Sequence, residues 1–447
     1  MLDFIWCYRI KSSCLQRLSD EVMNRDILRN IIQEGQDALT DISLYIRPIC
    51  FEDEGRYVLT GIRQAGKSYM LYQRALYLIS KGFDRRDMVF INFDDERLLG
   101  TKVSDLDLIL QVFSSMSEHS PILFFDEIQN VEGWEHFARR LANQKYRVTI
   151  TGSNARMLSR DIATTLGGRY IDVTIWPYSF REYLGATGVL TTENLEDLRW
   201  DLGKKRDEIR RSMASYFRWG GFPELLLIPN SRRQWLNSLY NKILLGDIVQ
   251  RNKIRNETAV RFTVKRIAES IGQPVSYNRL SNLIKSVGLN TSAASVMEYV
   301  GYVKDACILF SLDNFASKFS EREAVKKYYF TDNGLLNIFL TGGDASLLEN
   351  MCAIALKAKY GDRVYFYNHR IEVDFLVPEE GLAVQSSYSV SDDDTLSREV
   401  AGLRKLNAIN PLRRMLIVTY EDETTIELGD GRKIEVLPLY KWLINNF

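Results

Sequence analysis

"GIRQAGKS", residues 61–68, decides the fold of the N-terminal part of this chain. The run before it, RYVLT (56–60), is rich in strand-forming residues, and the run after it (68–82) repeats apolar residues at helical spacing. A glycine loop between a strand and a helix lets successive backbone N–H groups converge on an anion at the helix N-terminus. The pattern G-x-x-x-x-G-K-S therefore predicts a phosphate-binding loop.

Length and composition predict a soluble globular protein of several domains. The chain has 447 residues, of which 45% are hydrophobic and 26% charged, so it is too long for one core. Its 58 Lys and Arg residues balance 58 Asp and Glu residues, and this neutrality does not indicate a nucleic-acid or membrane partner. We find no apolar run of membrane-spanning length and no signal peptide, so we expect a cytoplasmic protein with residues 1–22 as a peripheral extension.

The cysteine pattern argues against a structural zinc site. The five cysteines are scattered without a C-x-x-C pair, and the chain has only three histidines. Free thiols in a reducing compartment are the simplest interpretation. The cysteines are Cys7, Cys14, Cys50, Cys307 and Cys352.

The loop residues have distinct expected roles. Lys67 can reach the β- and γ-phosphates of a nucleotide, and Ser68 can offer its hydroxyl to Mg²⁺. ATP and Mg²⁺ are the expected ligands. The residues expected to surround the nucleotide are Gly61, Ile62, Arg63, Gln64, Ala65, Gly66, Lys67, Ser68 and Tyr69.

A second stretch, PILFFDEIQNVEGWE (121–135), predicts an apolar strand that ends in two carboxylates. Such a pair at a buried strand tip is unfavourable unless positive charge lies nearby. We expect Asp126 to hold Mg²⁺ and Glu127 to orient or deprotonate an attacking water. The alternative is a solvated strand end.

Two further residues are candidates for catalysis. Asn154 follows a predicted strand in YRVTITGSNARML (146–158), with Thr151 and Ser153 beside it, and could contact the γ-phosphate or the water. Arg169 precedes another strand and could stabilise charge on phosphate, in cis or from a neighbouring subunit. A solvated surface arginine is the alternative, and Arg160 is a weaker candidate for the same role.

Strands alternate with helices from about residue 56 to 177, which predicts a mainly parallel sheet with helices on both faces. The strand MVFINFDDERL (88–98) completes the set. Its acidic tip, Asp94, Asp95 and Glu96, is either a neighbour of the metal or a capped turn. The predicted class is a three-layer α/β/α P-loop NTPase module.

These motifs together resemble a large group of prokaryotic AAA-type ATPases in which the ATPase module precedes a C-terminal domain of unknown function. The resemblance implies that Asn154 is the first sensor and Arg169 an arginine finger. It also implies self-association through the ATPase module. Separately, we expect a protein partner whose identity the sequence does not give. The stretches that carry it are TGIRQAGKS (60–68), ILFFDEIQNVEGWE (122–135), ITGSNARML (150–158), LGGRYIDVTIWPYSFREYL (166–184), GGFPELL (220–226), ILLGDIVQRNKIRN (243–256), KYYFTDNGLLNIFL (327–340) and LLEN (347–350).

The rest of the chain predicts further domains. The expected divisions are an N-terminal helical extension (1–45), the ATPase module (46–185), a helical connecting region (186–270), a winged-helix-like domain (271–345) and a degenerate restriction-endonuclease-like α/β domain (346–447).

DNA is a weighed but not favoured partner. Residues 251–266 contain six basic residues against one acid, Glu257, and such a run either contacts phosphates or forms a solvated helix face. The expected groove-reading helix, TSAASVMEYVGYVK (291–304), has a single basic residue, Lys304, at its end. This scarcity of base-contacting side chains argues for a structural or protein-contact role. The six basic residues are Arg251, Lys253, Arg255, Arg261, Lys265 and Arg266.

The last hundred residues predict a nuclease-like fold without nuclease chemistry. Glu349 on a helix and Asp374 within a strand match two acids of a metal-dependent nuclease. The expected E-x-K positions are instead Gln385 and Ser387, and neither supplies a metal-binding acid or a positive charge.

We therefore predict an ATPase that couples its nucleotide state to its C-terminal domains. A DNA-associated ATPase and a nucleotide-gated protein-interaction module with little turnover remain alternatives. A phosphotransferase is a weaker hypothesis, and no N/T-K-x-D motif favours a GTPase.

Overall fold

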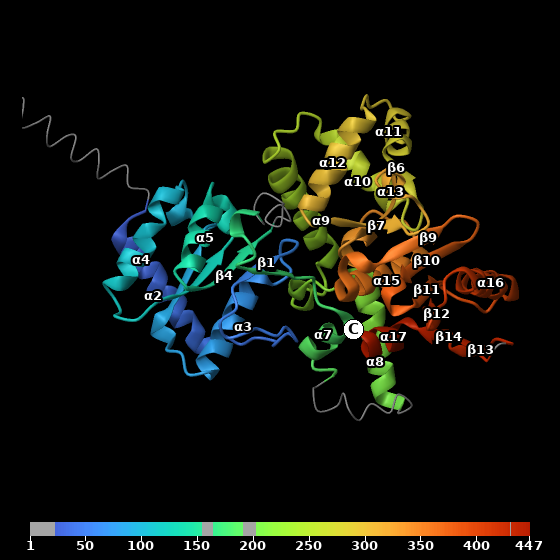
Figure 1. The fold of residues 1–447 in the computed structure, drawn as a ribbon, viewed down its shortest axis with the longest axis horizontal. Coiled ribbons are helices and arrows are strands. Elements are labelled where there is room, and N and C mark those ends of the chain that lie inside the picture. Colours follow the sequence, from blue (N-terminus) through green and yellow to red (C-terminus); the bar gives the residue numbers. More distant parts are fainter. Residues whose placement is uncertain (1–22, 154–163, 191–202, 430) are drawn as a thin grey trace, which may run out of the picture. The chain divides into compact units, whose positions relative to one another are not determined.

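The computed structural model describes residues 23–153, 164–190, 203–429 and 431–447 (Figure 1). These residues pack into two compact units, which we describe separately. The first unit contains the described residues up to Gly61 together with Gly66–Ile175. The second contains Ile62–Ala65 and the described residues of Trp176–Phe447.

A five-stranded sheet forms the first unit, with the strands in the order β2-β3-β4-β1-β5. All neighbouring strands are parallel, so the predicted parallel sheet is confirmed. Parallel strands end at one edge, and β4 lies between β1 and β3, so the carboxyl ends of these three strands meet there. The strands are β1 (Tyr57–Thr60), β2 (Met88–Asn92), β3 (Ile122–Asp126), β4 (Arg147–Gly152) and β5 (Ile171–Thr174).

Helices cover both faces of this sheet. On one face, alternate strand residues such as Val89 and Leu123 join a buried cluster with residues of α4 and α5. On the other face, Phe90 stacks on Phe124 and on Tyr72 of α3, with ring centroids 4.5 and 5.0 Å apart. The elements are α2 (Arg25–Asp41), α3 (Lys67–Ser80), α4 (Asp107–Ser114), α5 (Trp134–Asn143), and the 3₁₀ turns η1 (Arg85–Asp87), η2 (Glu96–Leu98), η3 (Val103–Asp105) and η4 (Ile128–Asn130).

The second unit is built on a nine-stranded mixed sheet, in the order β13-β14-β12-β11-β10-β9-β7-β8-β6. Strand β7 pairs in parallel with β9 at Asp313 and Asn314, so one sheet runs across the expected division between residues 345 and 346. The strands are β6 (Val275–Ser276), β7 (Leu309–Asn314), β8 (Val325–Phe330), β9 (Tyr365–Asn368), β10 (Glu372–Val377), β11 (Leu382–Ser386), β12 (Arg414–Thr419), β13 (Thr424–Glu427) and β14 (Lys433–Pro438).

Helices pack around this sheet. Helices α10, α11 and α12, which precede β7 in the chain, bury valine, leucine and isoleucine side chains against one another and against the β7–β8 hairpin. The elements are α7 (Phe180–Ala186), α8 (Gly203–Trp219), η7 (Pro223–Leu226), α9 (Arg232–Lys242), the π-helix η8 (Ile243–Gln250), α10 (Glu257–Ala268), α11 (Tyr277–Lys285), α12 (Ala293–Asp305), α13 (Phe319–Arg322), α14 (Asn333–Asn337), α15 (Asp344–Tyr360), η9 (Gly361–Arg363), η10 (Pro378–Glu380), α16 (Asp393–Ile409) and α17 (Leu439–Asn446).

One buried carboxylate joins two glycine-containing segments of the second unit. Asp332 caps α14 by accepting from the Gly334 and Leu335 N–H groups, and it also accepts from Gly221 N–H at 2.7 Å. Burial raises the pKa of Asp332 to about 7, against the effect of these backbone donors. Gly221 has no room for a side chain, because a Cβ there would lie 2.1 Å from the Tyr178 carbonyl oxygen. This packing explains why glycine and aspartate occur together in GGFP (220–223) and TDNG (331–334).

Across the described ranges, no helix is both long and apolar enough to span a bilayer.

Candidate functional site

The glycine loop lies at the carboxyl edge of the parallel sheet, between β1 and α3. Gly61 has φ +148°, and a Cβ there would lie 2.1 Å from the Ile175 carbonyl oxygen, so only glycine fits. Gly66 takes the left-handed conformation at the N-cap of α3, with φ +92°. Lys67 is buried, and its Nζ donates to the Gly61 carbonyl oxygen at 3.1 Å across the loop. The loop thus leads directly into a helix N-terminus, a position that favours binding of an anion.

Ser68 and Asp126 meet at this edge, although 58 residues separate them in sequence. The Ser68 hydroxyl donates to Asp126 Oδ2 at 2.6 Å, and the Thr151 hydroxyl donates to Asp126 Oδ1. Asp126 is 8% exposed. Burial raises its pKa, and the hydrogen bonds from Ser68 and Thr151 oppose that rise. Two hard oxygen ligands therefore converge beside a buried lysine, an arrangement that fits Mg²⁺.

Glu127 follows at the tip of β3 with an unusual backbone. Its φ is +50°, in the left-handed region, and it caps the 3₁₀ turn η4. Its N–H donates to Thr151 Oγ1 at 3.1 Å, so Thr151 contacts both acidic residues. Its Oε2 accepts from the Ser153 hydroxyl at 3.0 Å and from the Gln129 side-chain amide. The structure thus brings Lys67, Ser68, Asp126 and Glu127 together at this edge of the sheet, and their roles toward a nucleotide stay predictions.

The remaining loop residues differ in exposure. Ile62 and Ala65 are buried, Gln64 is exposed with φ +64°, and Tyr69 is 60% exposed. Arg63 belongs to the second unit, where its Nε donates to Asp247 at 2.6 Å. The roles of these residues toward a nucleotide stay predictions.

Arg169 lies away from this site. Strands β1 and β5 are parallel, with Tyr57 opposite Ile171, so Arg169 precedes the amino end of β5 at the edge opposite the glycine loop. Its side chain donates to Asn143 Oδ1 at 2.6 Å and to the Leu166 carbonyl oxygen at 3.2 Å. Within one chain Arg169 therefore does not face the loop, and a role between subunits stays a prediction.

The other sequence candidates have separate outcomes. Asn154 and Arg160 lie outside the described residues. In the acidic tip after β2, Asp95 accepts from the backbone N–H of Arg97 and pairs with its guanidinium. Asp94 Oδ1 accepts from Asn130. These contacts favour the capped-turn interpretation over a metal neighbour.

Gln129 was not anticipated from the sequence. Its side chain reaches back to Glu127 because the left-handed Glu127 turns the chain into the tight η4 turn. The only sequence signal is its position two residues after Glu127 in DEIQ.

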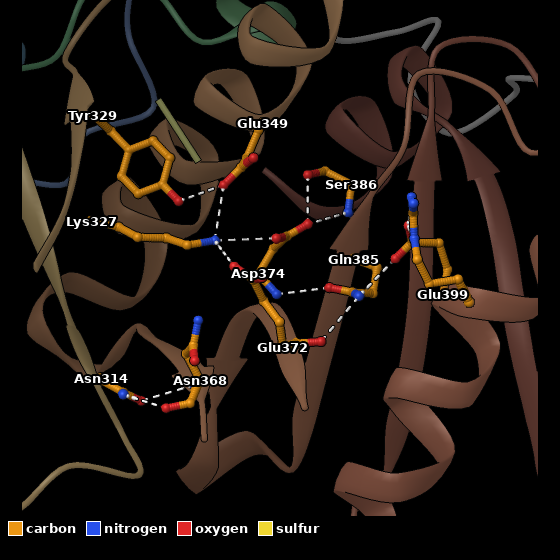
Figure 2. Close-up of polar contacts among 11 residues, drawn as sticks. Asn314, Lys327, Tyr329, Glu349, Asn368, Glu372, Asp374, Gln385, Ser386 and Glu399 are labelled. Atoms are coloured by element: carbon orange, nitrogen blue, oxygen red, sulfur yellow. Dashed lines mark hydrogen bonds and ion pairs between the residues drawn. The ribbon is translucent and has the colours of Figure 1, made fainter. Parts of the chain in front are cut away.

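The C-terminal half of the second unit holds a polar cluster around Lys327 of β8 (Figure 2). Lys327 is fully buried, and its Nζ lies 3.4 Å from Glu349, 3.3 Å from Glu372 and 3.3 Å from Asp374. Glu349 comes from α15, and both other acids come from β10. The Tyr329 hydroxyl donates to Glu349 Oε1 at 2.8 Å. One lysine thus neutralises carboxylates from two other elements.

Charge and burial act against each other in this cluster. Burial lowers the pKa of Lys327, but Asp374, Glu349 and Glu372 outweigh that effect and raise it overall. Burial and the charge of Asp374 raise the pKa of Glu349, against the effects of Lys327 and Tyr329. Lys327 is not among the residues predicted from the sequence, because the E-x-K pattern puts the positive charge on the strand that became β11, whereas Lys327 lies on β8.

The expected E-x-K positions have other contacts. Gln385 accepts from Asp374 N–H and donates to Glu399 Oε2, both at 2.7 Å. The Ser387 hydroxyl donates to the Ser389 carbonyl oxygen at 2.9 Å, and it is the neighbouring Ser386 that donates to Asp374 (Figure 2). In the described parts of the chain, no group of three or more His, Cys, Asp or Glu side chains is arranged to hold a metal ion.

Several cations of the basic run are paired with acids. Arg261 contacts Glu257 at 2.7 Å, and Arg266 contacts Glu269 at 2.6 Å. Lys304, at the end of α12, is half-buried and donates to Ser311 at 3.0 Å. Burial lowers the pKa of Lys304. These contacts describe helix-face pairs and a packed lysine more than a phosphate-binding surface.

Comparison with known proteins finds family matches for two parts of the chain. The sequence profile of an AAA domain matches residues 53–184, and that of a domain of unknown function (DUF8612) matches residues 210–346. An uncharacterised protein of Methanocaldococcus jannaschii is 30% identical over 401 residues, covering 86% of this chain and 87% of that protein. An uncharacterised protein of Haemophilus influenzae is 28% identical over 400 residues, covering 87% and 94%.

Among solved structures, the Walker-type ATPase of Pyrococcus abyssi is similar at a TM-score of 0.41 and 13% identity, covering 64% of this chain and 90% of that one. The ORC1 protein of Aeropyrum pernix, solved in complex with DNA, has a TM-score of 0.25 and 17% identity, covering 70% and 90%. AMPPCP-bound DnaA from Aquifex aeolicus has a TM-score of 0.24 and 15% identity, covering 61% and 86%.

Proposed function

Because the chain belongs to the family in which an AAA domain of the P-loop NTPase fold is followed by a domain of unknown function, we propose that it binds Mg-ATP and hydrolyses it. The observation that carries the proposal is the meeting of Lys67, Ser68, Asp126 and Glu127 at one edge of the sheet. Hydrolysis would then drive or switch the C-terminal part of the chain.

Each residue has a defined task in this reaction. The loop N–H groups and Lys67 would hold the phosphates, and Ser68 and Asp126 would hold the metal. Bound Mg²⁺ would neutralise charge on the phosphate oxygens. Glu127 accepts a proton from water as the water oxygen bonds to the γ-phosphorus, and the bond from that phosphorus to the bridging oxygen of ADP breaks. The products are ADP and phosphate.

Steady-state phosphate release by purified protein tests this function. Wild-type protein should turn over ATP, and Lys67→Ala should lose both nucleotide affinity and turnover. Glu127→Gln should keep nucleotide binding and lose about 10²–10⁴-fold in kcat, the usual contribution of a general base. Equal rates in wild type and Glu127→Gln would refute the proposal.

We propose that the Lys327 cluster is an ion-pair network and not a nuclease centre. Three carboxylates share one buried ammonium group. The position where a third metal-binding acid is expected holds Gln385 instead. Metal-dependent DNA cleavage that survives Lys67→Ala but is lost in Asp374→Ala would overturn this.

The partner classes stay separate proposals. A winged-helix-like role for the α10–β8 segment and a DNA-associated ATPase are tested by DNA binding at low salt and by stimulation of ATP turnover. Light scattering with and without ATP tests self-association and a role of Arg169 between subunits. Tight ATP binding with negligible turnover until a protein partner is added would favour the gated interaction module. Cytoplasmic location is a proposal that cell fractionation tests.

A further inference from the structure

We propose that Gln129 is the positioning residue of the ATPase site: it fixes the Glu127 carboxylate and holds the attacking water. This inference rests on the proposed ATP hydrolysis and adds to it a residue for which no phosphate-loop or acidic-strand motif assigns a role. Its basis is the contact geometry around the tip of β3.

The first observation is that Gln129 reaches the same carboxylate oxygen as Ser153. Its Nε2 donates to Glu127 Oε2, which also accepts from the Ser153 hydroxyl at 3.0 Å. The Gln129 Nε2 and Ser153 Oγ atoms are 3.4 Å apart. The carboxylate is thereby held between the η4 turn that follows β3 and the end of β4. A base held by two donors keeps one orientation, which general-base catalysis requires.

The second, independent observation is the other atom of the same amide. Gln129 Oε1 is buried, and no donor in the described chain lies within hydrogen-bond distance of it. Leaving a buried amide oxygen without a donor is unfavourable, so such an atom is expected to have a partner in the working site. Because Oε1 and Nε2 share one carbon, this acceptor lies beside Glu127.

Water is the ligand that fits both groups. A water molecule can donate one proton to Gln129 Oε1 and the other to Glu127, and its oxygen lone pair is then directed away from both acceptors. ATP hydrolysis needs this arrangement, in which the base takes one proton while a second acceptor fixes the nucleophile.

The backbone supports this arrangement. Glu127 is one of few described residues other than glycine with a positive φ, at +50°. A left-handed residue is strained unless its surroundings hold it, and here the Glu127 N–H bond to Thr151 does so. The strained turn is what brings residue 129 back beside residue 127.

Substitution of Gln129 tests the inference. Gln129→Met keeps the side-chain length and removes both polar atoms, and Gln129→Glu keeps the shape but replaces the donor by a carboxylate. Both should lower kcat roughly 10- to 100-fold with little change in the KM for ATP, as expected for a misplaced reacting group. Gln144→Met, on the exposed end of α5, is the matched control and should keep wild-type kinetics.

Two readouts separate positioning from a merely structural role. In a Glu127→Gln background, Gln129→Met should lower kcat by less than twofold more, because residues that act as a unit are not additive. Gln129→Met should also weaken trapping of Mg-ADP with aluminium fluoride, which mimics the attacked phosphate, while ADP affinity stays unchanged.

The outcomes distinguish the two proposals. Wild-type turnover with an unchanged kcat in both Gln129 variants would overturn this inference and leave the ATPase standing. Turnover that rises in Gln129→Met would also overturn it, since Gln129 would then restrain Glu127. A wild type that neither turns over ATP nor traps aluminium fluoride would overturn both.

Discussion

Replacement of Lys327 by methionine should destabilise the C-terminal part of the second unit more than replacement of any exposed residue. Lys327 has no exposed side-chain surface, and Glu349 and Asp374, each 16% exposed, would lose their shared cation. Leaving buried charges unpaired in this way is unfavourable by about 3–5 kcal/mol. Glu372 is 47% exposed, so water compensates most of its loss and it adds little.

The effect of Lys327→Met should depend on pH with a defined sign. Lys327 opposes the raised pKa of Glu349, so its removal leaves burial and the charge of Asp374 to raise that pKa further. A carboxyl group whose pKa is raised in the folded state stabilises the fold below its unfolded pKa and loses that stability as pH rises. We therefore expect the deficit of the variant to be larger at pH 8 than at pH 5.

Hydrogen exchange measured by mass spectrometry on peptides from β8, α15 and β10 isolates this region from the first unit. Lys357→Met is the matched control, since Lys357 lies on α15, the helix that carries Glu349, but pairs with a fully exposed carboxylate, Asp362. That control should change stability by less than about 1 kcal/mol. Equal protection in the two variants, or a deficit that grows as pH falls, would refute the reasoning.

Three further predictions concern single contacts. Burial raises the pKa of Asp332 to about 7, so the unfolding free energy of wild type should fall as pH rises from about 4 to 7, by at most about 1.4 kcal/mol per pH unit. Asp332→Asn should flatten that slope in urea titrations at several pH values. An unchanged slope would contradict the assignment. Thr151→Val removes the hydroxyl that contacts both Asp126 and Glu127, and should lower kcat in phosphate-release assays without preventing nucleotide binding. Gly61→Ala places a Cβ against the Ile175 carbonyl oxygen and should abolish binding of a fluorescent ATP analogue, whereas normal affinity would show that the loop can shift.

The AAA domain was predictable because its motifs are short and contiguous. Residues 61–68 are one run, and Asp126 and Glu127 are adjacent. Parallel strands bring the ends of such runs to one edge, so strand prediction was enough to bring Ser68 to Asp126.

The contacts of Gln129 and Arg169 needed backbone information that a sequence pattern does not contain. Gln129 contacts Glu127 only because Glu127 adopts a left-handed conformation. Arg169 lies at the opposite sheet edge because β5 runs parallel to β1, so a residue before β5 cannot reach the loop after β1.

The Lys327 cluster could not be predicted from motif spacing. Its lysine lies 22 residues before Glu349 and 47 before Asp374 in sequence. The three residues meet only because β8 and β10 belong to one sheet, joined through the short β7–β9 pairing. The E-x-K pattern expects its lysine on a strand next to β10, and β8 is not next to β10 in the sheet.

The nine-stranded sheet also limits which fragments of this protein can fold by themselves. A fragment that begins at residue 346 would lose β7, leave one edge of β9 unpaired, and keep Glu349 and Asp374 without their lysine. An open strand edge is a template for aggregation with other copies. Expression trials that cut there should yield insoluble protein, whereas a fragment that begins before α7 keeps the sheet whole. Recombination during evolution would face the same restriction, so the second unit is expected to be exchanged between proteins as a single piece.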